Sequence, residues 1–155
     1  MIPALPCLQF KTMSHPLQCL LIDNDEDDQE IFAMALKEIS PVISCTFMSS
    51  GIMALEKLKT DLSFLPSLIF IDLNMPLMDG EECLLEIKKL SHLEKVPIYI
   101  YSTAALPRLA VRMKELGAAD FIVKPFDPVR LLKAIDLLAR QTQPQWQSKS
   151  CLMAN

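Results

Sequence analysis

Four polar side chains of complementary chemistry each follow a short apolar run: the carboxylates of Asp23 and Asp72, the hydroxyl of Ser102 and the ammonium of Lys124. Two carboxylates ~4 Å apart repel each other by up to ~4 kcal/mol at an effective dielectric constant near 20. A pocket that holds both therefore needs positive charge, which Lys124 and an oxygen-seeking dication such as Mg²⁺ can supply. A carboxylate in such a pocket can accept a phosphoryl group, and the pattern favours Asp72 as the nucleophile.

The run before Asp72, from Leu68 to Ile71, contains only apolar residues. A run this short and apolar is typical of a strand buried on both faces of a parallel sheet. Pro76 interrupts the segment, and Asp79 with Glu82 three residues later predicts the capped start of a helix. Asp72 is therefore expected at the carboxyl end of a strand, where open α/β sheets bind ligands. Alternatively, it only ends the strand and accepts hydrogen bonds from nearby backbone N–H groups.

Five predicted strands alternating with five predicted helices would position these side chains. The strands are Leu17–Ile22, Val42–Met48, Leu68–Asp72, Pro97–Tyr101 and Asp120–Val123. The helices are predicted from apolar residues at helical spacing: Ile31, Phe32, Ala35, Leu36 and Ile39; Ile52, Leu55 and Leu58; Cys83, Leu84, Ile87 and Leu90; Leu109, Met113 and Leu116 before Gly117; and Leu131, Leu132, Ile135 and Leu138 after Asp127-Pro128. The alternation predicts an α/β fold with a parallel sheet and helices on both faces. The carboxyl ends of its strands would bring the four polar side chains to one edge.

The composition is that of a globular domain of ordinary size. The 155 residues are 51% hydrophobic and 22% charged, and a net charge of −4 without a basic stripe disfavours nucleic-acid binding. The five cysteines are scattered, and Cys19, Cys45 and Cys83 lie in apolar segments, as expected of free thiols in a reducing cytoplasm. No apolar run approaches the roughly 20 residues of a membrane span. The first residues do not resemble a signal peptide.

From about Leu17 to Arg140 the chain resembles the receiver domains of two-component response regulators, in particular the stand-alone chemotaxis-regulator type. The resemblance rests on Asp23 in the first acidic loop, Asp72 in IDLNMPLMDG, Ser102 after the fourth strand, and Lys124-Pro125 in ADFIVKPF. It implies a flavodoxin-like (βα)5 fold, a doubly wound five-stranded parallel sheet with strand order 2-1-3-4-5. It also implies Mg²⁺ as cofactor and a sensor histidine kinase or histidine phosphotransfer protein as phosphodonor. Enzymatic activity would be limited to self-catalysed, Mg²⁺-dependent phosphoryl acceptance and autodephosphorylation.

The resemblance also assigns roles around the acceptor. Asp72 would be the phosphorylated residue, and Asp23 and the backbone carbonyl of Asn74 would be further Mg²⁺ ligands. Ser102 would bind a phosphoryl oxygen. Lys124 would pair with the phosphoryl group, and its peptide bond to the following proline would be cis.

The expected readout surface is the fourth helix, fifth strand and fifth helix, from Leu106 to Arg140. Phe121 matches the aromatic switch position that turns inward when the hydroxyl residue moves. Leu106 is no N-cap, so the start of the fourth helix would lack a capping side chain. Taken singly, Ser102 also fits an ordinary strand-end hydroxyl, Lys124 a solvated lysine, and Phe121 a plain core residue.

The predicted domain organisation has three parts: a flexible extension at 1–16, the receiver domain at 17–140, and a Gln-rich tail without fixed structure at 141–155. The tail is too short for a DNA-binding module. We therefore expect signalling through contact with a downstream protein, or use as a phosphate shuttle, without direct DNA binding.

One position departs from the family pattern. Receiver domains usually carry two adjacent acids after the first strand, and here the second is Asn24. Asn24 can still offer its carbonyl oxygen as a metal ligand, but the amide removes one negative charge from the metal site. This predicts weaker Mg²⁺ binding than in a fully acidic relative unless Asp25 rotates in to substitute. Asp27 and Asp28 are interpreted separately, as acids that favour the first turn of the helix.

Three other functions remain as alternatives. A pseudo-receiver would keep the fold without the phosphorylation, and Asn24 supports this reading. A dehalogenase-like aspartyl phosphatase also uses a strand-end Asp, but normally has a second Asp two residues on, where this chain has Asn74. A flavodoxin-like mononucleotide binder is disfavoured because the chain has only three glycines and no Gly-rich phosphate loop.

Overall fold

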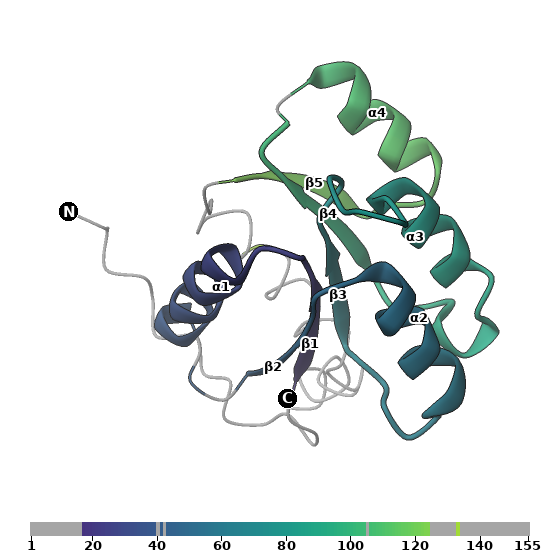
Figure 1. Ribbon diagram of the computed structural model, residues 1–155. Coiled ribbons are helices and arrows are strands. Elements are labelled where there is room, and N and C mark those ends of the chain that lie inside the picture. Colours follow the sequence, from purple (N-terminus) through teal and green to yellow (C-terminus); the bar gives the residue numbers. More distant parts are fainter. Residues whose placement is uncertain (1–16, 40, 42, 105, 125–132, 134–155) are drawn as a thin grey trace, which may run out of the picture.

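A five-stranded parallel sheet in the order β2-β1-β3-β4-β5 forms the centre of the domain (Figure 1). The computed structural model describes residues 17–39, 41, 43–104, 106–124 and 133. The strands are β1 (Gln18–Ile22), β2 (Ser44–Met48), β3 (Leu68–Ile71), β4 (Ile98–Ser102) and β5 (Asp120–Val123). The predicted flavodoxin-like sheet and its strand order are confirmed, and the bounds of β5 are those predicted.

The helices alternate with the strands along the described part of the chain. They are α1 (Glu26–Ile39), α2 (Gly51–Thr60), α3 (Gly80–Lys88) and α4 (Pro107–Glu115). A short 3-10 helix, η1 (Ser91–Leu93), was not predicted. The predicted fifth helix, the 1–16 extension and the 141–155 tail lie outside the described residues. None of the described helices has the length and apolar character needed to cross a membrane.

Two clusters of buried apolar side chains pack against opposite faces of the sheet. Along β3, Ile69 and Ile71 belong to the cluster that contains α2, α3 and α4, whereas Leu68 and Phe70 belong to the cluster on the α1 side. This alternation follows from the two-residue period of a strand. All four residues are fully buried, as predicted for a strand covered on both faces. Figure 1 shows α1 on one side of the sheet and α2 and α3 on the other.

Two helix positions predicted as part of apolar faces are instead exposed: Ile31 by 45% and Ile52 by 47%. In α1 the buried face contains Phe32, and Ile31 is rotated from it by about 100°. In α2 the buried face is centred near Gly51, whose missing side chain lets the helix lie close to Met78. Ile52 is therefore carried to the solvent side.

The helix ends follow the sequence signals. The N–H of Glu82 donates to Asp79 Oδ1 (2.9 Å) and the N–H of Asp79 to Glu82 Oε2 (3.2 Å), which completes the predicted capping box of α3. Gly117, just after α4, has a left-handed φ of 104°. As predicted, Leu106 provides no side-chain cap at the start of α4.

Candidate functional site

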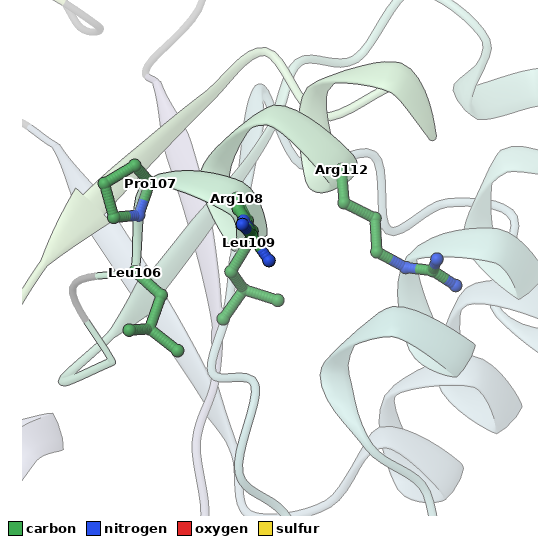
Figure 2. Close-up of a pocket in the computed structure, with 5 residues that line it drawn as sticks. All are labelled: Leu106, Pro107, Arg108, Leu109 and Arg112. Atoms are coloured by element: carbon green, nitrogen blue, oxygen red, sulfur yellow. The ribbon is translucent and has the colours of Figure 1, made fainter.

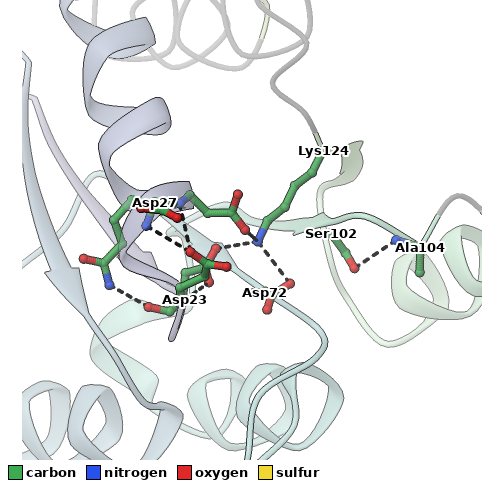
Figure 3. Close-up of polar contacts among 9 residues, drawn as sticks. Asp23, Asp27, Asp72, Ser102, Ala104 and Lys124 are labelled. Atoms are coloured by element: carbon green, nitrogen blue, oxygen red, sulfur yellow. Dashed lines mark hydrogen bonds and ion pairs between the residues drawn. The ribbon is translucent and has the colours of Figure 1, made fainter.

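The four polar residues singled out in the sequence converge at one edge of the sheet (Figure 3). Asp23 follows β1, Asp72 follows β3, Ser102 is the last residue of β4, and Lys124 follows β5. All four side chains are buried, and within the described residues they are the buried polar or charged set. The N–H of Asp72 donates to the carbonyl of Ile22 (2.9 Å), which places Asp72 beside Asp23.

Lys124 lies at the centre of this group. Its Nζ is 2.5 Å from Asp23 Oδ2, 2.8 Å from Asp28 Oδ2 and 3.4 Å from Asp72 Oδ1. It also lies 5.0 Å from the centre of the Tyr101 ring. One ammonium thus holds three carboxylates together, from two strand ends and one helix.

The electrostatics of the site are set by burial and by these contacts. Burial raises the pKa of the Asp72 carboxyl, the charge of Lys124 opposes that rise, and the nearby Asp23 adds to it. Burial alone would lower the pKa of Lys124, but hydrogen bonds to Asp23 and Asp28 and the charge of Asp72 outweigh it and raise the pKa above its ordinary value. Burial also raises the pKa of Tyr101 to about 12. At neutral pH the lysine is therefore a fixed cation.

The acidic loop after β1 divides its residues between the site and the start of α1. Asp25 Oδ1 accepts hydrogen bonds from the N–H of Asp27 (2.9 Å) and of Asp28 (3.3 Å), so Asp25 serves as a helix cap. Its own N–H donates to Asp23 Oδ1 (3.0 Å), which orients that carboxylate. Asn24 is exposed. The predicted metal role of Asp25 thus competes with its capping role.

Asp28 was interpreted from the sequence only as a favourable first-turn acid, and that interpretation was incomplete. Its carboxylate forms an ion pair with Lys124. The available signal was helical spacing: Asp28 precedes the buried Phe32 by four residues, so both lie on the face of α1 that turns toward the sheet.

The loop after β3 and the start of α3 fix the position of Asp72 through backbone contacts. Its carboxylate accepts a hydrogen bond from the backbone of Asn74. The N–H of Gly80 donates to the carbonyl of Leu73 (3.0 Å), so the start of α3 folds back against the residue that follows Asp72. A Cβ at Gly80 would lie 2.4 Å from the carbonyl oxygen of Asp72. The backbone of Asp72 therefore packs directly against Gly80, with no room for a side chain at position 80.

Ser102 and Phe121 occupy neighbouring strands, in the part of the site linked to α4. Ser102 Oγ accepts a hydrogen bond from the N–H of Ala104 (3.3 Å). Phe121 is buried in the cluster that contains α2, α3 and α4. Its ring thus already lies inside the domain in this structure, while its switching role stays a prediction. The predicted cis bond after Lys124 lies outside the described residues.

The residues present fit a divalent cation. Asp23, Asp28 and Asp72 contribute three negative charges and Lys124 one positive charge, which leaves an excess of two negative charges. Among the described residues no group of three or more His, Cys, Asp and Glu side chains forms a complete metal cage. Mg²⁺ does not require one, because it commonly binds one or two carboxylates and keeps several waters.

A hollow of about 690 Å³ lies at the beginning of α4, near the loop that follows Ser102 (Figure 2). Leu106 and Leu109 supply apolar lining, and Pro107 and Arg108 complete it together with Arg112. Arg112 donates from Nε to Glu81 Oε2 of α3 (2.8 Å). The hollow forms part of the predicted readout surface, whose remainder after residue 124 is not described apart from residue 133.

Comparison with known proteins gives one consistent family. Residues 19–136 match the family described as the response regulator receiver domain. The chain is 36% identical over 113 residues to the two-component response regulator ORR11 of Oryza sativa, and the match covers 73% of this chain and 74% of that protein. Two-component response regulator ORR6 of Oryza sativa subsp. japonica is 33% identical over 112 residues, which is 72% of this chain and 65% of that protein.

Solved structures share the fold. The chemotaxis protein CheY4 of Vibrio cholerae superposes with a TM-score of 0.69 at 25% identity, covering 80% of this chain and 99% of that one. The Mn²⁺-bound form of response regulator Rcp1 gives a TM-score of 0.65 at 24% identity, over 90% of this chain and 100% of that one. The second likeness supports the fold alone.

Proposed function

The chain belongs to the family of response regulator receiver domains, and on that premise we propose that it accepts a phosphoryl group on Asp72 from a sensor histidine kinase or a histidine phosphotransfer protein. One observation supports this function above all others. Asp72 stands at a strand end with a buried ammonium 3.4 Å away and a second carboxylate, Asp23, on the same ammonium. This is the arrangement in which an added phosphoryl group meets both a counter-charge and a metal-binding acid.

The transfer is a substitution at phosphorus. A carboxylate oxygen of Asp72 attacks the phosphorus of a phosphohistidine, and a P–O bond forms as the P–N bond breaks. The electron pair of the broken bond stays on the imidazole nitrogen, which takes up a proton. Lys124 offsets the charge that accumulates on the phosphoryl oxygens, and the burial of Asp72 limits early hydrolysis of the acyl phosphate.

Asp23, Asp72 and the backbone carbonyl of Asn74 are the groups we propose to hold Mg²⁺. When bound, the ion neutralises charge on the transferring phosphoryl group. Two structural neighbours are described with a divalent ion, a CheX-CheY-BeF3-Mg²⁺ complex from Borrelia burgdorferi and the Mn²⁺-bound form of Rcp1, and we propose an ion of the same kind for this chain.

The proposed signal is the rearrangement that follows this change of charge. A phosphoryl group adds about −1.5 to −2 charges and three acceptor oxygens. Ser102 and Lys124 gain partners that exist only in this state. We propose that the change then reaches Phe121, on the strand next to that of Ser102, and the uncapped start of α4. We propose a downstream protein as the reader of this surface, and the cytoplasm as the compartment, in keeping with the free thiols Cys19, Cys45 and Cys83.

Incubation with a small phosphodonor and Mg²⁺, followed by intact-mass measurement, tests the function. The wild-type protein is expected to gain the mass of one labile phosphoryl group, and Asp72→Asn is expected to gain none. A folded wild-type protein that gains nothing would instead support the pseudo-receiver. Steady turnover of a generic phosphate ester, lost in Asp72→Asn, would support the aspartyl phosphatase.

Asn24→Asp is expected to strengthen Mg²⁺ binding by roughly three- to tenfold, because it adds a carboxylate directly after Asp23 in the chain. Isothermal titration with Mg²⁺ measures the change. Lys95→Met, far along the chain after η1, would serve as a control for net charge because it shifts the total charge by the same amount. Unchanged affinity in Asn24→Asp would show that position 24 is not near enough to the ion to matter.

A further inference from the structure

Asp28 on the first turn of α1 has no role in the function proposed above, although it makes one of the closest contacts in the site. Its Oδ2 is 2.8 Å from Lys124 Nζ, whereas Asp72 Oδ1 is 3.4 Å from the same nitrogen. In this structure the lysine is therefore held closer to α1 than to the acceptor.

The three carboxylates around Lys124 differ in how readily they can release it. The side chain of Asp23 is 0% exposed, so its loss of the ammonium would leave a buried charge without a partner. The side chain of Asp28 is 29% exposed, so water can solvate its carboxylate when the lysine leaves. Asp28 is thus the partner that the lysine can exchange at low cost.

The position of Asp28 is fixed from both sides. Its N–H donates to Asp25 Oδ1 (3.3 Å), which secures the start of the helix. One turn further on, the Phe32 ring packs edge-to-face on Phe70 and Tyr101, with centroid distances of 4.9 and 5.6 Å. Because Lys124 lies over that same Tyr101 ring, the helix and the lysine share one rigid support.

We propose that Asp28 is a positioning residue that retains Lys124 on the α1 side of the site and releases it when Asp72 carries a phosphoryl group. The inference rests on the proposed function, because only a phosphoryl group at Asp72 supplies the competing charge. It follows that the Asp28–Lys124 pair opposes the phosphorylated state, and that its strength determines how easily that state forms.

The chain offers a matched set of variants for the test. Asp28→Asn removes the ion pair together with one negative charge. Asp27→Asn removes the same charge from the same helical turn, where Asp27 is exposed and, within the described residues, pairs with no cation. Asp28→Glu keeps the charge and can restore the contact.

The first measurement is the affinity for beryllium trifluoride with Mg²⁺, followed by 19F NMR. Asp28→Asn is expected to bind roughly three- to fivefold more tightly than wild type, the upper part of the range for loss of a partly exposed ion pair. Asp27→Asn and Asp28→Glu are expected to stay within about twofold of wild type. Equal affinities in Asp28→Asn and Asp27→Asn would overturn the proposal.

The second measurement is the side-chain ammonium NMR signal of Lys124 in metal-free protein, assigned by its absence in Lys124→Arg. It is expected to shift in Asp28→Asn and to stay in place in Asp27→Asn. Tighter binding without that shift would mean that charge alone is responsible, and would overturn the role of Asp28. A folded wild-type protein that binds no beryllium trifluoride would instead overturn the proposed function and the release step. The ammonium signal would still decide whether Asp28 and Lys124 form an ion pair in the unmodified protein.

Discussion

Replacing Lys124 with methionine is expected to destabilise the protein by about 3 kcal/mol or more at neutral pH in metal-free buffer. The substitution keeps an unbranched side chain of similar length, one atom shorter, but leaves Asp23, Asp28 and Asp72 without their shared cation. Two of these carboxylates are buried, so water cannot replace the ammonium. Urea unfolding followed by circular dichroism gives the free energy of unfolding directly.

Lys114→Met is the matched control for this prediction. Lys114 pairs with Asp120 Oδ1 at 3.0 Å, but the two side chains are 53% and 40% exposed. Loss of such a surface pair is expected to cost less than about 1 kcal/mol. Added Mg²⁺ should restore stability to Lys124→Met more than to Lys114→Met, because only the first variant creates uncompensated charge at the edge of the sheet where we propose that Mg²⁺ binds. Equal losses in the two variants would mean that Lys124 is not the charge that holds the cluster together.

Gly80→Ala is expected to destabilise the protein by about 2–3 kcal/mol or more, and to impair phosphoryl acceptance in the fraction that folds. An added Cβ would lie 2.4 Å from the Asp72 carbonyl oxygen, 2.7 Å from Leu73 Cα and 3.0 Å from the Asp72 carbonyl carbon. All three are backbone atoms, so the clash can be relieved only by moving the loop that carries Asp72. Thermal unfolding and intact-mass labelling measure the two effects.

Gly51→Ala tests whether the effect depends on that loop, because Gly51 is also the first residue of a helix. Its added Cβ would meet Met78 Sδ at 3.1 Å and Cys83 Sγ at 3.2 Å, which are side-chain atoms that can shift. We expect a stability change below about 1 kcal/mol and normal labelling. If both alanine variants were equally stable and equally labelled, the close packing of Gly80 against the backbone of Asp72 would not be needed for stability or for phosphoryl acceptance.

The fold was predictable because each local signal agreed with the others. Short apolar runs ended in polar residues, helical spacing followed each run, and Asp79 with Glu82 marked a helix start that the structure reproduces. The convergence of Asp23, Asp72 and Lys124 followed from parallel strand direction alone. No contact between individual side chains was needed for that inference.

What the sequence did not reveal depends on contacts between elements. Ile52 is exposed because the buried face of α2 includes Gly51, which packs against the loop residue Met78, and this contact between two elements is not evident from helical spacing alone. The pairing of Asp28 with Lys124 joins residues 96 positions apart. The contact was missed because an acidic residue in the first turn of a helix is already explained by its favourable interaction with the helix dipole. The strand-end residues of the site were therefore predicted, whereas Asp28 was missed although its helical spacing from the buried Phe32 was a usable signal.

The most direct test of the central claim is to locate the modified residue. Borohydride reduces an acyl phosphate to an alcohol with loss of phosphate, so a phosphorylated aspartate becomes homoserine. After treatment with a phosphodonor and Mg²⁺, peptide sequencing is expected to find homoserine at position 72 and at no other aspartate. Homoserine at position 23, 25 or 28, or a stable phosphoryl group on a different residue type, would contradict the assignment of Asp72 as the acceptor.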